Sequence, residues 1–154
     1  MTQEQKDLLI KDLCGRLPYG VFAECNDNDG SLPNIWRVAY VNIITEDLYL
    51  LNTETTATKL ISVEDIKPYL FPLSSMTEEQ KKELEELYFG YISDEIFNNI
   101  EFIYHYDCIH LIDWCYKNNL DINGLIPRGL ANDATNLNIY INTLLQLFKM
   151  MKQS

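Results

Sequence analysis

The sequence has few of the residues on which several large classes of protein depend. Its 154 residues include only 6 glycines, 5 prolines and 4 cysteines, and 12 basic side chains face 23 acidic ones. Collagen-like and low-complexity chains need far more glycine and proline. Direct binding to nucleic acid and docking on anionic membranes both rest on lysine and arginine, so the net charge of −11 disfavours both.

Long hydrophobic runs and paired cysteines are also missing. No stretch reaches the ~18 apolar residues of a membrane-spanning helix, and the N-terminus lacks the basic and apolar regions of a signal peptide. No two cysteines have the C-x-x-C spacing of a zinc ribbon or a thioredoxin-like site. We therefore expect a cytoplasmic protein without a cofactor, in which Cys14, Cys25, Cys108 and Cys115 are free and half-buried.

The residues that are present favour a folded chain. Hydrophobic residues make up 47% and aromatic residues 12%, which is too apolar for a disordered protein. A chain of this length can bury a sizeable core without disulfides or metal ions. No repeat or linker is visible, so we expect a single α+β domain over residues 1–154, rich in strands at 19–62 and in helices at 77–152.

The N-terminal half changes from helical to extended patterning. Thr2 and Gln5 have capping-box spacing and open a predicted helix over residues 2–14, which Gly15 should end. Predicted strands follow at 19–25, 35–44, 48–51 and 56–61, and a single helical turn at 62–65 closes the sheet. Apolar residues on both faces of 35–44 predict a strand covered on both sides. Short antiparallel strands of this kind favour a small curled sheet or an SH3-like half-barrel.

The C-terminal half is predominantly helical in pattern. Thr77-Glu78-Glu79-Gln80 is a capping box that opens a helix running to about residue 88. We expect a strand at 100–105, a helix at 106–118, a structured loop at 121–135 and a final helix to about residue 151.

Both histidines lie in one short segment, which is the main candidate for chemistry. Asp107, His110 and Asp113 are spaced three apart, so they share one face of a helix and could hold a metal ion or orient a general base. Solvated or capping side chains explain the same spacing more simply, because a catalytic site needs further partners that the sequence does not offer. A small metal-dependent hydrolase therefore stays an alternative.

Two other patterns have structural explanations. Asp27 to Gly30 resembles part of a calcium loop, but the first and twelfth ligand positions hold Cys25 and Trp36, so a polar hairpin turn fits better. The segment from Gly124 to Gly129 carries Arg128 between two glycines, a composition that suits a phosphate-binding loop. Pro127 removes one of the amides that such a loop needs, so we expect a structural turn. With no catalytic motif elsewhere, the sequence favours a protein that is not an enzyme.

The last predicted helix has more apolar residues than one buried stripe requires. Such an excess indicates deep burial or a surface for a protein partner or self-association. The candidate interface residues are Ile139, Leu145, Phe148 and Met150.

Three blocks of the chain resemble one family of proteins. They are QKDLLIKDLCGRLPYGV at 5–21, KPYLFPLSSMTEEQKKE at 67–83, and a signature over 113–140 that includes DW, DINGLIPRGLAND and LNIY. They are similar to small uncharacterised proteins of gut Bacteroides-type bacteria and their phages and mobile elements. The chain departs from that signature at Ile122-Asn123, where Tyr-Arg is usual. The resemblance implies bacterial or phage origin, and it implies no activity or catalytic residue.

These observations lead to one hypothesis and two alternatives. The leading hypothesis is a non-enzymatic protein-interaction module that uses the sheet edge or the last helix. The alternatives are the metal-dependent hydrolase and an acidic decoy that occupies the nucleic-acid groove of a host or defence protein. Residues 74–105 carry 8 acidic and 2 basic side chains, whereas residues 106–154 carry 4 of each and have no net charge. We therefore expect a partner to dock on this C-terminal part.

Overall fold

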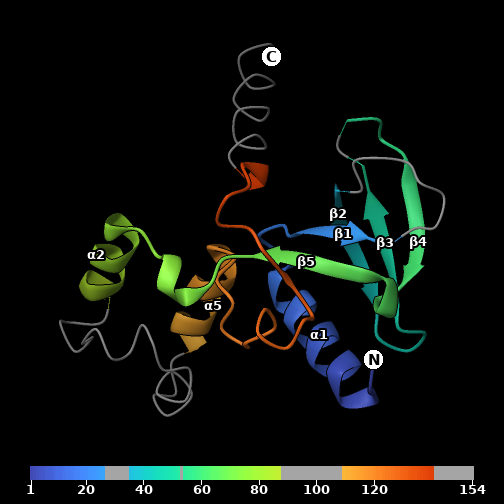
Figure 1. The fold of residues 1–154 in the computed structure, drawn as a ribbon, viewed down its shortest axis with the longest axis horizontal. Helices are drawn as coiled ribbons and strands as arrows, with labels where there is room; N and C mark the ends of the chain where they lie inside the picture. Colours follow the sequence, from blue (N-terminus) through green and yellow to red (C-terminus); the bar gives the residue numbers. More distant parts are fainter. Residues whose placement is uncertain (27–34, 53, 88–108, 141–154) are drawn as a thin grey trace.

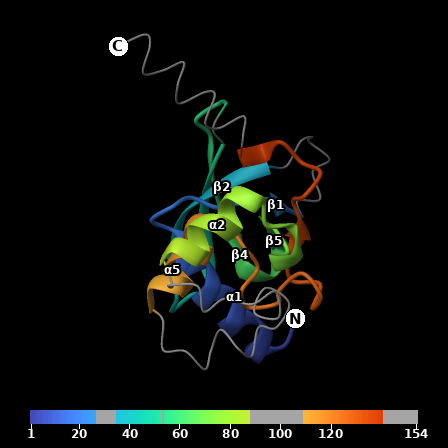
Figure 2. The same ribbon diagram turned by 90° about the vertical axis from the view of Figure 1, so that its left-hand side faces the viewer.

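The computed structural model describes residues 1–26, 35–52, 54–87 and 109–140. Helix α1 (Gln3–Arg16) packs against a sheet, while α2 (Glu78–Leu87) and α5 (Ile109–Lys117) lie together at the other end of the molecule (Figures 1 and 2). This arrangement confirms an α+β fold that begins with a helix. In the described part of the chain, none of the helices has the length and apolar character needed to cross a membrane.

One six-stranded sheet organises the fold. Its strands are β1 (Phe22–Cys25), β2 (Ile35–Asn42), β3 (Asp47–Leu51), β4 (Thr58–Ser62), β5 (Ile66–Leu70) and β6 (Asn132–Asp133), in the order β4-β3-β2-β1-β5-β6. All neighbours are antiparallel except β5 and β6. Two 3₁₀ turns, η1 (Val63–Asp65) and η2 (Leu73–Ser75), flank β5. Among the described strands, β4 and β6 are the two edge strands of the sheet. Closure into an SH3-like barrel stays a prediction.

Helix α1 begins as its sequence predicts and ends later. The Thr2 hydroxyl accepts a hydrogen bond from the Gln5 amide at 3.2 Å, and the Gln5 side chain accepts one from the Thr2 amide at 2.9 Å. The expected stop at Gly15 is wrong, because the helix continues to Arg16. Gly15 serves a packing purpose instead, since the ring of Tyr116 from α5 lies where a β-carbon at this position would be.

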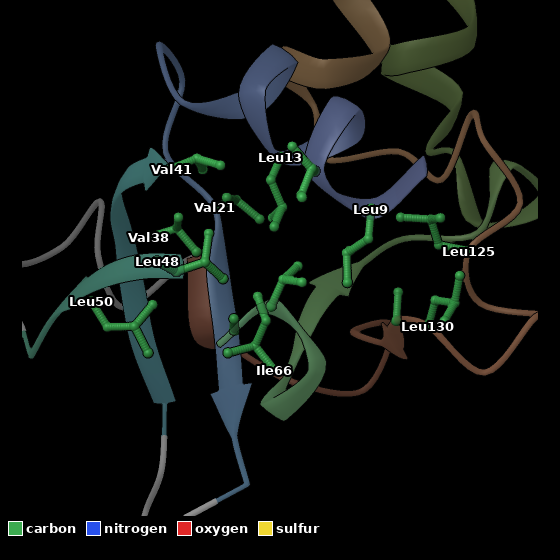
Figure 3. Close-up of a cluster of buried hydrophobic side chains, with 14 of the residues drawn as sticks. Leu9, Leu13, Val21, Val38, Val41, Leu48, Leu50, Ile66, Leu125 and Leu130 are labelled. Carbon is green, nitrogen blue, oxygen red and sulfur yellow. The ribbon is translucent and has the colours of Figure 1, made fainter. Parts of the chain in front are cut away.

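The main core lies between α1 and one face of the sheet, which we call the inner face. Figure 3 shows Leu9 and Leu13 of α1 pointing toward side chains of β1 to β3 and of the loop around Leu125 and Leu130. The buried members on the strands are Ala23, Cys25, Val38, Val41, Leu48, Leu50, Ile66 and Leu70, and Val21 lies directly before β1. Burying this set is the dominant favourable contribution to folding.

The opposite, outer face of the sheet is covered only in part. Phe22 and Tyr69 on β1 and β5 pack with Ala134, and Ile139 and Tyr140 join them from the chain that follows β6. Over β2 to β4 the outer face is open, so the expectation that strand 35–44 is covered on both sides is wrong. A β-bulge between Val38 and Tyr40 shifts the alternation, so that both Val38 and Val41 face the core while Tyr40 is exposed on the outer face.

The helical end of the molecule has its own cluster of buried side chains. Helix α2 starts at the predicted capping box, where the Gln80 amide donates to the Thr77 hydroxyl at 3.1 Å. Leu84 of α2 packs with Leu111 and Trp114 of α5, which confirms a helix within the predicted range 106–118. The strand expected at 100–105 and the final helix beyond residue 140 lie outside the described residues.

Replacing Gly15 by alanine tests the contact between α1 and α5. The new β-carbon would lie 2.3 Å from Cε2 of Tyr116, whose ring is held by the neighbouring Arg16 and Asn123. We expect Gly15→Ala to destabilise the protein by about 1–2 kcal/mol, because overpacking outweighs the better helix propensity of alanine. Urea unfolding followed by circular dichroism measures this.

The matched control is Lys11→Ala on the exposed side of the same helix. Its unfolding free energy should stay within about 0.5 kcal/mol of the parent. A Gly15→Ala protein as stable as the control would show that the α1–α5 contact is not close-packed.

Candidate functional site

The predicted metal ligands are not gathered in the described structure. His110 and Asp113 are exposed on α5, and Asp107 lies outside the described residues. The Tyr19 hydroxyl donates a hydrogen bond to the Asp113 carboxylate, and this bond raises the pKa of Tyr19. Among the residues that the structure describes, no group of three or more His, Cys, Asp or Glu side chains could hold a metal ion.

The described cysteines have the environment of structural rather than reactive thiols. Cys14 is half-buried, and Cys25 and Cys115 are buried. Burial raises the pKa of the Cys115 thiol to about 12, and it also raises that of Cys14. Because the thiolate is the nucleophile, these groups are poorly suited to covalent catalysis at neutral pH.

The loop from Gly124 to Gly129 is built around Asp121, a residue that the sequence reading missed. The buried Asp121 carboxylate accepts hydrogen bonds from the amides of Leu125 at 2.7 Å and Ile126 at 2.9 Å. Burial raises the pKa of this carboxyl, while the two amide bonds lower it. These amides are the groups that a phosphate would need, so the loop is a structural turn, as expected.

A buried ion pair lies beside this loop. Both Asp12 and Arg16 are fully buried on α1, one helical turn apart. The Arg16 guanidinium donates to the Asp12 carboxylate from Nε at 2.6 Å and from Nη2 at 2.9 Å, and Nη2 also donates to the Leu120 carbonyl at 2.8 Å. The guanidinium carbon lies 4.9 Å from the centre of the Tyr116 ring, and Asn123 donates to Asp12 at 2.7 Å.

This cluster is part of the architecture of the protein. The Arg16 guanidinium bonds to Asp12 of its own helix and to the distant Leu120 carbonyl, and its side chain has no exposed surface through which a ligand could enter. The spacing of Asp12 and Arg16 at i and i+4 is the signal in the sequence that indicates a pair. Its burial is not visible there, because it depends on the chain from Leu120 to Asn123.

Exposed carboxylates are spread over separate elements. They lie on α1 at Glu4 and Asp7, on η1 at Glu64 and Asp65, and on α2, whose exposed set is Glu78, Glu79, Glu83, Glu85 and Glu86. Helix α2 and η1 stand at opposite ends of the long axis of the molecule (Figure 1). A decoy of nucleic acid needs its charges along one surface, and it remains a prediction from charge alone.

Of the four candidate interface residues, one is described. Ile139 is half-buried and packs against the cluster formed by Phe22, Tyr69 and Ala134. The neighbouring Tyr140 hydroxyl donates to the Tyr69 carbonyl at 2.6 Å, so this segment is held on the outer face of β1 and β5. Leu145, Phe148 and Met150 lie outside the described residues.

The outer face of β2 to β4 carries an exposed row of large apolar side chains, which the sequence reading did not single out. Tyr40 lies opposite Tyr49, and Tyr49 lies opposite Leu60, so the three residues cross the sheet side by side. Their exposed fractions are 56%, 47% and 60%. We call Tyr40, Tyr49 and Leu60 the outer row.

Polar residues border most of the outer row. Asn42, Asp47 and Ser62 form the next row toward the β2–β3 turn, and in the row on the other side Arg37 and Thr58 flank the half-buried Leu51. An apolar centre within a polar rim is the usual composition of a protein-binding surface. Tyrosine is also among the residues that contribute most to binding energy at such surfaces.

Comparison of the chain with protein-family models, with curated proteins and with solved structures finds no match. We therefore infer the function from the geometry of the outer row and of β4, the strand at the end of the sheet.

The buried ion pair gives a direct test of what holds α1 in place. Asp12→Ala would leave the Arg16 guanidinium buried without its carboxylate, so we expect a loss of about 3–5 kcal/mol in the free energy of unfolding. The double variant Asp12→Ala/Arg16→Met should lose less than Asp12→Ala alone, because it removes the unpaired charge. Urea unfolding of the two variants measures the difference.

Asp7→Ala is the control, since Asp7 is an exposed aspartate of the same helix. It should change the unfolding free energy by no more than about 0.5 kcal/mol. Equal losses in the Asp7 and Asp12 variants would contradict a special role for the buried pair.

Proposed function

We propose that this chain is a non-enzymatic protein-interaction module whose binding surface is the outer row on β2 to β4. The observation that carries the proposal is the cross-strand alignment of Tyr40, Tyr49 and Leu60 on an open sheet face. Exposed apolar side chains that stand singly are common and mean little. Three of them in register on adjacent strands form a continuous contact surface.

The support beneath the outer row suits binding. On the inner face of the same strands, Val38, Leu48 and Leu50 are buried in the main core against α1. The backbone that presents the outer row is therefore fixed by packing from behind. A fixed surface loses little conformational entropy when a partner binds, which favours affinity.

The bulge between Val38 and Tyr40 increases local twist, and this supports a curled sheet of the SH3-like kind. Origin in a gut Bacteroides-type bacterium or its phage rests on the resemblance of the three sequence blocks, and a cytoplasmic setting rests on the sequence pattern.

Photo-crosslinking tests whether the outer row meets a protein. A benzophenone amino acid placed at Tyr49 should form cross-links when the protein is incubated with a lysate of Bacteroides-type cells or with further copies of itself. The same group at Lys11, on the exposed side of α1, should not form them. Gels followed by mass spectrometry identify the products.

A triple variant tests which side chains are needed. Tyr40→Thr/Tyr49→Thr/Leu60→Thr keeps residues that favour strands but removes the apolar surface, so affinity for whatever cross-links at Tyr49 should fall at least about tenfold, the equivalent of ~1.4 kcal/mol. The control, Ile43→Thr/Ile44→Thr/Leu137→Thr, removes three other exposed apolar side chains. Equal losses in both variants would indicate non-specific adhesion and contradict the proposal.

A further inference from the structure

Strand β4 ends the sheet, and its backbone shows which groups face outward. The Val63 amide donates to the Glu46 carbonyl at 2.9 Å, and the Asn52 amide donates to the Ala57 carbonyl at 2.9 Å. Hydrogen-bonded pairs alternate along an antiparallel ladder. The backbones of Lys59 and Ile61 therefore bond to β3, whereas Thr58, Leu60 and Ser62 direct their N–H and C=O groups away from it.

These outward groups form an edge that another strand can extend. Sheet order places β4 at the end, and beyond it lies no other strand of the described chain (Figure 1). The opposite end of the sheet is less suitable, because β6 has two residues only and the Asp133 side chain bonds to the following Thr135 amide. Leu60 is the middle residue of β4 and also belongs to the outer row. The outward backbone edge and the exposed apolar surface therefore share this residue.

We propose that the partner of this surface is a second copy of the chain, joined through antiparallel pairing of the two β4 strands about Leu60. The inference rests on the proposed function and adds the identity of the partner. With Leu60 opposite Leu60 of the second copy, the two outer rows join into one ladder of six apolar side chains across both sheets. The outward N–H and C=O groups of Thr58 and Leu60 and the N–H group of Ser62 then gain hydrogen bonds, while the Ser62 carbonyl already caps η1.

The side chains of β4 fit this register without a conflict of charge. Thr58 faces Ser62 of the second copy, two hydroxyl residues that pair well across strands. Lys59 faces Ile61, so no two like charges are directly opposite. Lysine often protects sheet edges from pairing, but the Lys59 ammonium lies on the inner face, 5.8 Å from the centre of the Trp36 ring and on the side away from Leu60.

Single cysteines test the register directly. Paired residues of the Leu60 type have Cα atoms about 5.5 Å apart, which is within the range for a disulfide. In a Cys14→Ser/Cys108→Ser background, Leu60→Cys should therefore oxidise to a covalent dimer. Thr58→Cys alone should form at least about tenfold less dimer, because its two copies would lie four residues out of register, more than ~10 Å apart. A mixture of Thr58→Cys with Ser62→Cys should cross-link again.

A proline substitution in the middle of β4 tests the pairing of the two strands. Leu60→Pro removes an N–H group that points away from β3, so the monomer should keep its fold, as circular dichroism can verify. Its dimer dissociation constant, from sedimentation velocity at about 1–200 μM, should rise at least about tenfold relative to the parent, because two intermolecular hydrogen bonds and the contact between the two Leu60 side chains are lost. The interface is small, so we expect the parent dimer to dissociate in the micromolar range.

Each outcome bears on one proposal or the other. A parent protein that stays monomeric throughout, or a Leu60→Cys variant that cross-links no more than Thr58→Cys, would overturn the pairing of two copies. If a foreign protein still cross-links at Tyr49 in that case, the outer row remains a binding surface and the partner is a different chain. Absence of both dimer and cross-link would remove the proposed function as well.

Discussion

The buried pair between Asp12 and Arg16 is the constraint on which the rest of the structure depends. One guanidinium joins three segments, because it bonds to its own helix, to the Leu120 carbonyl and to the face of the Tyr116 ring. A buried charge that loses its carboxylate partner costs several kcal/mol, and the carbonyl and the ring add further contacts, so the guanidinium favours one relative position of the three segments. The apolar core alone would be more permissive, since hydrophobic burial has little directional preference.

This fixed position explains how the two ends of the molecule are coupled. Leu120 stands directly before Asp121, whose carboxylate shapes the following loop, and the loop leads to β6 at the end of the sheet. The Phe71 amide and carbonyl bond to Asn119 and Asp121, so the same short segment also ties β5 to the helical end. The placement of β6 therefore depends on a charge in α1, more than one hundred residues earlier.

Local chemistry made part of the fold predictable. The capping boxes at Thr2 and Thr77 depend on residues three apart, and both open helices as expected. The strands of the β2–β3–β4 meander follow from alternating patterns and turn residues. The expected end of α1 at Gly15 is wrong, because a glycine near the end of a helical pattern commonly terminates the helix. Here Gly15 instead makes room for the ring of Tyr116, which is distant in sequence. The same limit applies to Arg16, whose burial depends on partners more than one hundred residues away.

The outer row could not be read from the sequence for a different reason. Apolar side chains stand at both the odd-numbered and the even-numbered positions of residues 35–44. Such a pattern normally indicates a strand covered on both faces. The bulge before Tyr40 shifts the alternation by one residue and places Val38 and Val41 on the same face. Tyr40 is then left on the outer face, in line with Tyr49 and Leu60.

The outer face is closed over β1 and β5 and open over β2 to β4, and this asymmetry has a physical consequence. The segment around Ile139 and Tyr140 gains a tyrosine–carbonyl hydrogen bond and aromatic contacts by covering Phe22. Arg37, exposed in the row next to Tyr40, separates that covered region from the open one along the face. The open apolar surface thus lies between Arg37 and the outward backbone edge of β4. The partner that fits it best supplies both apolar side chains for the surface and a strand for the edge. Strand β4 itself has this combination, and it is present in every copy of the chain.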